Sequence, residues 1–453
     1  MFYVVEYIDM VTSNKNEVIW VSYSNKEEKI KRLFSLIDER YIRTIETDNI
    51  IDITIQYILS NLDHHNSHIS KKDTTKTENQ LKGRFVGIGI EYQLIDDTIV
   101  ITRKDNEKPF SILIKKQTFS LQSIESVYML DEDLGYIKLN HFGDHAFEEF
   151  QQEVKKLRSL GMNEPIFDLR DYTEDRVDIA INIVYGLLEE DQLIIFTKQR
   201  NGPNQYYYAT SQGSFKEDSL YVLLNERSTS ADEIIDGTLQ DNDRGTIVRR
   251  PFFGNRLIQQ DINLGDRSLV RLTVTQYFIT VGPSIQKNYD VKYNKYEAIP
   301  ETYSSKNVGF SNALKFTTSK GKVILEGGGV TLDILIPTES IQTKSWLDDP
   351  MSYDFLNNLA FNYIDAHRSK LNQYTAQKFI DHFDTKSIIN KILFHLKKDK
   401  NFNQTDQETL AIFLKGFMAR QLFDLEIFYQ ILNQRDTMII KILNLKKLNK
   451  TPL

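Results

Sequence analysis

The 453-residue sequence contains no cysteine. Disulfide bonds, thiol catalysis and zinc sites with cysteine ligands are therefore excluded, although no compartment is, because exported proteins can also lack cysteine. No stretch approaches the ~18 consecutive apolar residues that a membrane-spanning helix needs. The net charge of −7 provides no basic surface for nucleic acid. We therefore expect neither nucleic-acid binding nor a membrane span.

Signals for export and for cofactors are also missing. The first residues, MFYVVEYIDMVTSNK, lack the basic start and apolar stretch of a signal peptide. As written, the chain would stay in the cytoplasm unless its true start is missing, so its localisation is left open. The glycines in EGGGV, residues 326–330, lack the Lys-Ser/Thr of a phosphate loop and are typical of a tight turn. We expect no cofactor.

The first part of the chain predicts helices followed by strands. Residues 25–62 have helical periodicity, and residues 86–119 contain two or three strand-like segments with a hairpin turn near Asp105 and Asn106. The strand LGYIKLNHF then leads to a helix over residues 145–159. We predict Asp144 as its N-cap and Gly161 as its C-terminal stop.

From there to residue 344, strands and helices alternate, which favours an α/β core with largely parallel strands. From Ser345 onward the pattern is mostly helical. Amphipathic stripes in this region could pack on the core or form a subunit interface, and we favour packing. One such stripe contains Leu410, Phe413, Leu414 and Phe417.

A serine lies where a predicted buried strand, LYVLL, turns into a predicted helix. The stretch reads NERSTSADEII, and Ala231, Ile234, Ile235, Thr238 and Leu239 form one helical stripe behind Ser230. Serine is a favoured N-cap, and spacing alone favours that role. Unpaired backbone N–H groups at a helix start can also stabilise an oxyanion beside a nucleophilic serine.

Other segments of the sequence decide whether Ser230 is a helix cap or a nucleophile. STSADEIIDGTLQDNDRGTIVRRPFFGNRLIQQ resembles the catalytic region of the carboxyl-terminal processing, or tail-specific, serine peptidases, whose pattern includes S-A-S-A-S-E-I and T-F-G-K-G-x-V-Q. Also similar, and in the same order, are LDHHNSHI, LKGRFVGIGIEY, LGYIKLNHF, FDLR, RLTVTQYFITVGPSIQK and LEGGGVTLDILIP. The chain is therefore identified as a divergent member of that family.

The resemblance implies a fold and a division of the chain. We expect an α/β protein with a ClpP/crotonase-like peptidase core at 120–344, a mainly helical N-terminal region at 1–85 and a C-terminal helical region at 345–453. Relatives carry a PDZ domain that captures substrate termini by strand addition. Here residues 86–119 are too few for one, so we expect a β-hairpin remnant of a PDZ domain. Family relatives are usually exported.

The resemblance also implies a Ser-Lys dyad, in which a lysine takes the proton of the nucleophile. Ser230 is at the nucleophile position, but Asn255 is at the position of the lysine. Asparagine has no basic nitrogen, and the neighbouring Arg256 cannot act as a base because guanidinium stays protonated. Gln259 matches a glutamine that the family places near its dyad, and it can only hydrogen-bond.

A second departure concerns the oxyanion hole. The family combines the backbone after the nucleophile, here Ala231, with a glycine turn after L-D-L-R. This chain reads LRDYTEDRVD, so Thr173, Glu174 and Asp175 replace the glycines. The turn loses the conformational freedom of glycine, and carboxylates facing the site would oppose a developing negative charge. These carboxylates could instead point into solvent.

Other candidates favour structural roles. His64, His65 and His68 could suggest a metal site, but they overlie the family's L-D-P-H-S turn, so we expect no metal. His141 and His145 flank a helix start, which is typical of capping or surface residues. Asp168 and Arg170 end a core strand and are explained equally by an internal ion pair or by chemistry.

Two functions remain. The chain is either a serine peptidase with Ser230 as nucleophile and an unidentified base, or a non-catalytic scaffold or peptide-binding adaptor with the same fold. The departures at Asn255 and at Thr173–Asp175, together with the shortened PDZ region, favour impaired or absent catalysis. Either way, the expected partner is a polypeptide substrate or peptide ligand, and oligomerisation through the C-terminal helices is possible.

Overall fold

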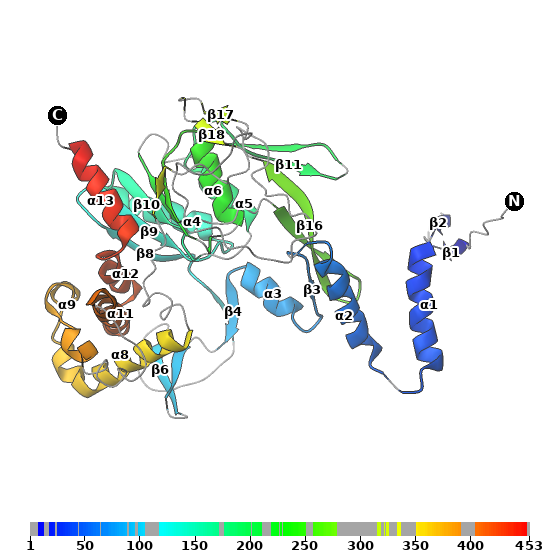
Figure 1. Cartoon of the computed structure of the whole chain (residues 1–453), viewed down its shortest axis with the longest axis horizontal. Coiled ribbons are helices and arrows are strands. Elements are labelled where there is room, and N and C mark those ends of the chain that lie inside the picture. The colour runs from blue at the N-terminus through cyan, green and yellow to red at the C-terminus, as the bar shows by residue number, and fades with distance from the viewer. Residues whose placement is uncertain are drawn as a thin grey trace. The chain divides into compact units, whose positions relative to one another are not determined.

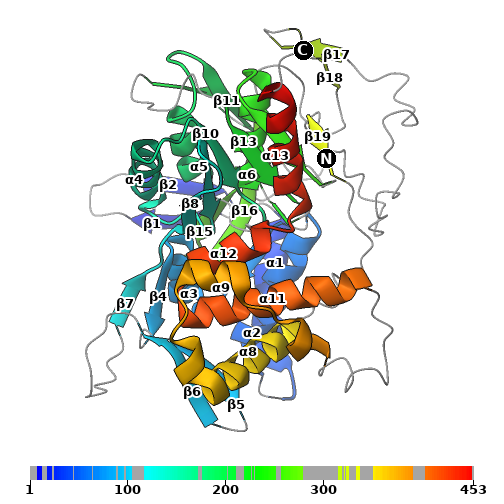
Figure 2. The ribbon, with the colours of Figure 1, turned by 90° about the vertical axis from the view of Figure 1, so that its left-hand side faces the viewer.

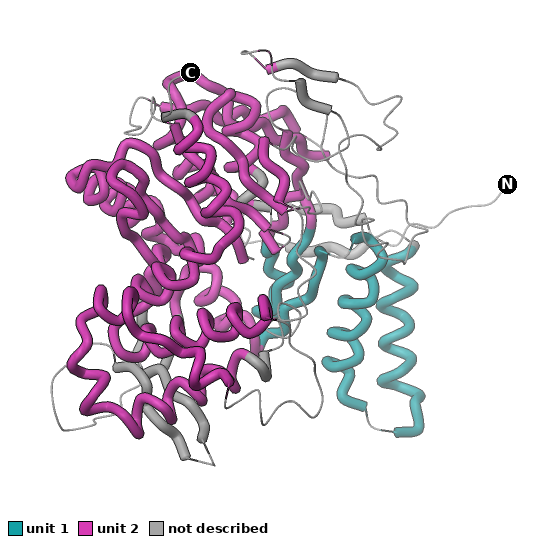
Figure 3. The backbone as a smooth tube through the Cα atoms, turned by 60° about the vertical axis from the view of Figure 1, so that its left-hand side comes forward, with its two compact units in different colours: residues 1–71, 261–272 teal, residues 72–260, 273–453 magenta. Residues whose placement is uncertain are grey.

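The fold is that of a computed structural model, which describes residues 8–12, 18–22, 25–43, 45–63, 65–87, 90–95, 98–104, 117–171, 176–200, 202–210, 219–225, 227–228, 230–250, 257–278, 315–318, 321, 323–325, 333–336, 350–390 and 404–450. The chain divides into two compact units, coloured separately in Figure 3. Unit 1 comprises residues 1–71 and 261–272, and unit 2 comprises residues 72–260 and 273–453. The hairpin turn predicted at Asp105 and Asn106 lies outside the described residues.

Unit 1 contains two helices and short strands. The helical periodicity of residues 25–62 is confirmed as α1 (Asn25–Arg40) and α2 (Thr47–Ser60). Strand β1 (Ile8–Thr12) pairs antiparallel with β2 (Val18–Ser22), and β3 (Ser67–Ile69) pairs with the first residues of β16 (Leu269–Phe278).

A largely parallel sheet forms the centre of unit 2, as the alternation of strands and helices predicts. Its order is β19-β14-β13-β10-β9-β8, and only the pairing of β8 with β9 is antiparallel. The strands are β8 (Ile124–Met129), β9 (Leu134–Leu139), β10 (Glu164–Asp168), β13 (Tyr221–Leu224), β14 (Thr246–Arg249) and β19 (Ile334–Leu335).

Apolar groups cover both faces of this sheet. Every residue of β9 and β13 is buried, as expected for strands packed on two sides. Alternate residues face opposite ways, so Ile137, Phe167 and Val222 pack with α4 (Ala146–Ser159), α5 (Val177–Tyr185) and α6 (Ser230–Asp241). Their neighbours Tyr136 and Ile166 pack instead against the C-terminal helix α13 (Thr437–Lys450), which lies along the sheet in Figures 1 and 2.

Most of the other strands pair antiparallel. They include LIIFTKQR and YYYAT, which follow the core alternation in sequence but belong to a second sheet, where β11 pairs with β12 and with the end of β16. Smaller pairs are β4 with β7, β5 with β6 and β17 with β18. The bounds are β4 (Arg84–Gly87), β5 (Ile90–Ile95), β6 (Thr98–Lys104), β7 (Gln117–Ser120), β11 (Leu193–Gln199), β12 (Gln205–Tyr208), β15 (Leu257–Asn263), β17 (Lys315–Thr317) and β18 (Val323–Leu325); helix α3 spans Thr74–Leu81.

The C-terminal region is helical, as predicted, and has a core of its own. The predicted stripe packs into this core, with Leu410, Leu414 and Phe417 buried and Phe413 partly buried. Among the described residues, no helix is long and apolar enough to cross a membrane. Before α13, the helices are α8 (Pro350–Leu371), α9 (Ala376–His382), α11 (Gln404–Leu422) and α12 (Leu425–Asn433).

The predicted N-cap of α4 is wrong. His145 is at the N-cap, and it makes no side-chain cap bond. The Asp144 carboxylate instead accepts hydrogen bonds from Arg84 at 3.0 Å and Arg176 at 3.2 Å. Ion pairs with two guanidinium groups therefore occupy the carboxylate that we expected to cap the helix. The predicted stop is confirmed, because Gly161 follows the helix end with a φ of +103°.

Candidate active site

Helix α6 begins at Ser230, as the sequence predicts. It follows β13, a central strand whose four residues are buried. The stripe behind Ser230 is also confirmed, since Ala231, Ile234 and Leu239 are fully buried. The first N–H groups of a helix lack intrahelical partners and carry partial positive charge. Ser230 and the Ala231 backbone are therefore at a helix start beside the carboxyl ends of parallel strands, where ligands of α/β sheets commonly bind.

Two polar contacts hold α6 against its surroundings. Asp236 pairs with Arg249 of β14 at 2.9 Å, with side-chain exposures of 0% and 4%. The Thr238 hydroxyl donates to the Ile194 carbonyl of β11 at 3.0 Å. Together with the apolar stripe, these contacts fix the helix that carries Ser230.

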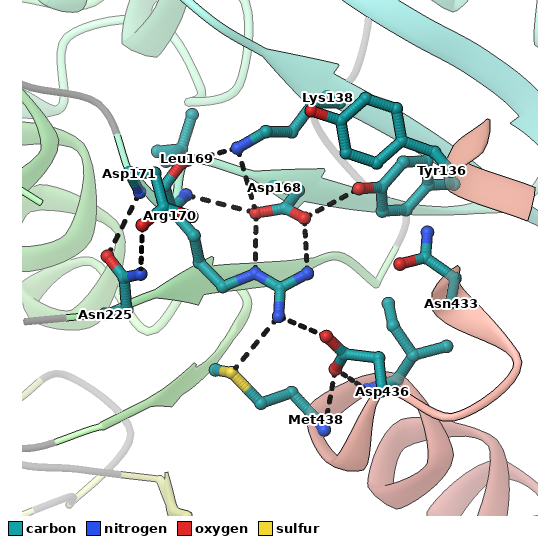
Figure 4. Close-up of polar contacts among 12 residues, drawn as sticks. Tyr136, Lys138, Asp168, Leu169, Arg170, Asp171, Asn225, Asn433, Asp436 and Met438 are labelled. Atoms are coloured by element: carbon teal, nitrogen blue, oxygen red, sulfur yellow. Dashed lines mark hydrogen bonds and ion pairs between the residues drawn. The ribbon is translucent and has the colours of Figure 1, made fainter. Parts of the chain in front are cut away.

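The loop between β13 and α6 is bonded to the segment that follows β10. The Ser228 hydroxyl donates to the Leu169 carbonyl at 3.1 Å and accepts from the Asn225 N–H at 3.1 Å. The Asn225 side chain accepts from the Asp171 N–H at 3.1 Å and donates to the Asp171 carboxylate at 2.9 Å. Figure 4 shows Asn225 facing Asp171. The segment before Ser230 and the segment leading to residues 172–175 are thus joined directly.

Asp171 has a φ of +65°, a left-handed conformation that is uncommon for residues other than glycine, although Asp tolerates it better than most. The two bonds from Asn225 compensate this cost, and they hold the chain direction at the point where it leaves β10.

Asp168 and Arg170 form an internal ion pair, which is one of the two explanations that the sequence leaves open. The guanidinium donates to both carboxylate oxygens, with Nε 2.9 Å from Oδ1 and Nη2 2.6 Å from Oδ2. The Tyr136 hydroxyl donates to Oδ2 at 2.7 Å, and the Lys138 ammonium lies 3.5 Å from Oδ1 (Figure 4). The Lys138 ammonium also donates to the Arg170 carbonyl.

Burial by itself would raise the pKa of the Asp168 carboxyl. The charges of Arg170 and Lys138, with hydrogen bonds from Arg170 and Tyr136, outweigh burial and hold this pKa well below its usual value. Burial and the Asp168 charge raise the pKa of Tyr136 well above its usual value. The group therefore stays ionised at Asp168 and neutral at Tyr136, which suits a structural anchor.

A second arginine anchors the start of α5. Arg176 donates to the Leu81 carbonyl at 2.8 Å, to Asp144 at 3.2 Å and to Asp178 at 2.9 Å and 3.0 Å. Residues 172–175 are therefore bracketed by anchored residues at both ends.

Some predicted site residues lie outside the described residues: Thr173, Glu174, Asp175, Asn255 and Arg256. Gln259 is described. It is half-buried in β15, and its side chain donates to the Leu257 carbonyl at 3.4 Å.

The histidines singled out in the sequence lie in different surroundings. Within the described residues, no group of three or more histidine, aspartate or glutamate side chains could hold a metal ion. His64 lies outside them. His145 is exposed, whereas His141 is buried rather than at the surface, and its ring lies 3.2 Å from the Leu121 carbonyl. Burial lowers the pKa of His141. A Cβ added at Gly83 would come within 2.7 Å of this ring, so His141 packs tightly against the backbone.

Comparisons with known proteins find similar sequences and structures. Residues 133–294 match the model of peptidase family S41, and residues 347–424 match a family of unknown function, DUF8443. The chain is similar to a carboxy-terminal-processing protease of Bartonella bacilliformis, with 24% identity over 59% of this chain and 75% of the relative. It is also similar to a carboxyl-terminal-processing protease of Synechocystis, with 30% identity over 40% of this chain and 42% of the relative.

Among solved structures, the photosystem II D1 C-terminal processing protease is similar over 55% of this chain and 82% of its own, with 18% identity and a TM-score of 0.38. The family match covers the strands and the helix that surround Ser230.

Proposed function

We propose that the chain, which resembles the carboxyl-terminal processing peptidases of family S41, is a polypeptide-binding member of that family whose serine endopeptidase activity is impaired or absent. One observation carries the proposal. The nucleophile position, Ser230, begins a helix at the carboxyl end of a central strand, whereas the position of the family's lysine is Asn255. The family's serine is therefore retained, and its lysine base is replaced.

The missing base has a calculable effect. A serine hydroxyl must lose its proton as it attacks a peptide carbonyl, and a positioned general base contributes about 10²–10⁴-fold to such a step. Asparagine cannot accept that proton, and neither can the guanidinium of Arg256. The substitutions at Thr173 and Glu174 add to the loss, because one missing oxyanion donor costs about 10²–10³-fold.

The organisation of the chain follows the same proposal. Residues 120–344 form a ClpP/crotonase-like peptidase core, and residues 86–119 are the remnant of a PDZ domain. The antiparallel pairing of β5 with β6 and of β4 with β7 supports a hairpin remnant. Residues 1–85 and 345–453 are the flanking helical regions.

A polypeptide is the proposed ligand, because relatives are named for processing carboxyl termini. Where catalysis is absent, the chain acts as a peptide-binding adaptor or scaffold. Oligomerisation through the C-terminal helices stays a prediction.

The test is proteolysis of unfolded casein by the purified full chain, beside Ser230→Ala and Asn255→Lys. We expect little or no cleavage by the parent and by Ser230→Ala, and a gain of cleavage in Asn255→Lys. Robust cleavage by the parent that disappears in Ser230→Ala would show that another group activates the serine. No gain in Asn255→Lys would place the main defect in the altered turn or in the substrate groove.

A further inference from the structure

The C-terminal helices reach the polar group around Asp168. At the junction between α12 and α13, the Asp436 carboxylate lies 2.5 Å from Nη1 of Arg170. Arg170 thus bridges two carboxylates, binding Asp168 through Nε and Nη2 and Asp436 through Nη1 (Figure 4). The side chains of Arg170 and Asp436 are only 14% and 19% exposed, so solvent screens this contact less than a surface pair.

The position of Asp436 is set by the docking of α13. Its Oδ1 atom accepts from the backbone N–H groups of Met438 at 2.9 Å and Ile439 at 3.1 Å, which caps the helix. At the far end of α13, the Lys446 ammonium lies 2.5 Å from Asp133 and 2.9 Å from Glu164. Apolar contacts with the sheet complete the docking and involve Met438, Ile439 and Ile442. The carboxylate therefore meets Arg170 from a fixed helix start.

Arg170 transmits this contact to the candidate site through the backbone. Its own N–H donates to Asp168 at 3.1 Å, and its carbonyl accepts from Lys138. The next residue, Asp171, is bonded to Asn225, which begins the loop to Ser230. The bidentate pair with Asp168 uses Nε and Nη2 of Arg170. The carboxylate of Asp436 binds the third guanidinium nitrogen, Nη1.

We propose that Asp436 is a positioning residue, which holds the Arg170–Asp171 segment and, through Asn225, the loop that carries Ser230. The C-terminal helical region would thereby be part of the machinery that shapes the nucleophile loop. This inference rests on the proposed role of Ser230 as the nucleophile position.

The first test is hydrogen–deuterium exchange of the full chain in Asp436→Asn. Asparagine is as good an N-cap as aspartate, so α13 keeps its cap while Arg170 loses the charge. Charged hydrogen bonds are roughly twice as strong as neutral ones, and we expect exchange in peptides covering 169–176 and 225–231 to rise about tenfold. The matched control is Lys446→Gln, which removes the distal ion pairs of α13 and leaves Asp436 with Arg170.

The deciding quantity is a ratio: the rise in the exchange rate of peptides 169–176 and 225–231, divided by the rise in the exchange rate of α13. A larger ratio in Asp436→Asn than in Lys446→Gln supports the proposal. An equal or smaller ratio overturns it, because loosening of α13 would then explain the loops. Because hydrogen–deuterium exchange does not require proteolysis, it tests the role of Asp436 even if the proposed function fails.

The second test uses kinetics in the Asn255→Lys background. Adding Asp436→Asn is expected to lower kcat about tenfold with KM unchanged, and Asp436→Glu to restore most of it, while Lys446→Gln leaves kcat unchanged. A fall in kcat of the same size in Lys446→Gln would contradict a positioning role. Absence of activity in Asn255→Lys would place the main defect in the altered turn or in the substrate groove, and the exchange ratio would then decide the role of Asp436.

Discussion

Replacing Arg249 by methionine is expected to destabilise unit 2 strongly, because it leaves Asp236 buried without its guanidinium partner. The two side chains are 4% and 0% exposed, and their closest atoms are 2.9 Å apart. At an effective dielectric constant of 20, their attraction is roughly 6 kcal/mol, most of which offsets the cost of desolvating both charges. Removing one partner of such a pair costs about 3–5 kcal/mol, because the desolvation cost of the other remains.

The assay is a double-mutant cycle in urea, followed by circular dichroism at pH 7. With a slope of about 3 kcal/mol per molar, Arg249→Met should lower the midpoint by more than about 1 M. The double variant Asp236→Leu with Arg249→Met should recover most of this loss, since replacing a whole buried pair by apolar groups is often neutral. A loss below about 1 kcal/mol in Arg249→Met, or a double variant as unstable as the single one, would refute the reasoning.

Two further predictions concern stability. Burial would lower the pKa of Lys446, but contacts with Asp133 and Glu164 raise it above its usual value. The contribution of Lys446 to the free energy of unfolding is therefore fully present below the unfolded pKa of about 10.4 and is lost as the pH rises beyond it. Thermal unfolding of the parent and of Lys446→Met should therefore differ at pH 8 and converge above about pH 10.4, and a difference that grows with pH would contradict this sign. Gly245 has a φ of +98°, and an added Cβ would lie 2.7 Å from Leu220, so Gly245→Ala should cost about 2–4 kcal/mol in urea unfolding. The control Gly265→Ala has a similar φ of +101° with nothing within 4 Å and should cost less; equal losses would rule out the contact with Leu220.

Local patterns predicted much of the fold around the site. The start of α6 at Ser230 and its buried stripe follow from helical periodicity after a strand, and the parallel sheet follows from the alternation of elements. The ion pair of Asp168 with Arg170 could also be considered from the sequence, because the two residues lie two positions apart at the end of one strand.

Contacts between distant parts of the chain were not predictable in this way. Asp144 has the residue type and position of an N-cap, but its carboxylate binds Arg84 and Arg176, which are far from it in sequence. Asp436 lies 266 positions from Arg170, and its local sequence signals only a helix cap. Similarly, β11 and β12 have ordinary strand patterns that do not specify which sheet they join.

The central claim is that the serine position is kept while the base is lost, and the most direct measurement is the initial rate of casein cleavage. Four chains are compared: the parent, Ser230→Ala, Asn255→Lys, and Asn255→Met, whose side chain is similar in length to lysine but has no amine. We predict a rate for Asn255→Lys about 10²–10⁴ times that of the other three. A parent that cleaves as fast as Asn255→Lys and loses its activity in Ser230→Ala would contradict the account.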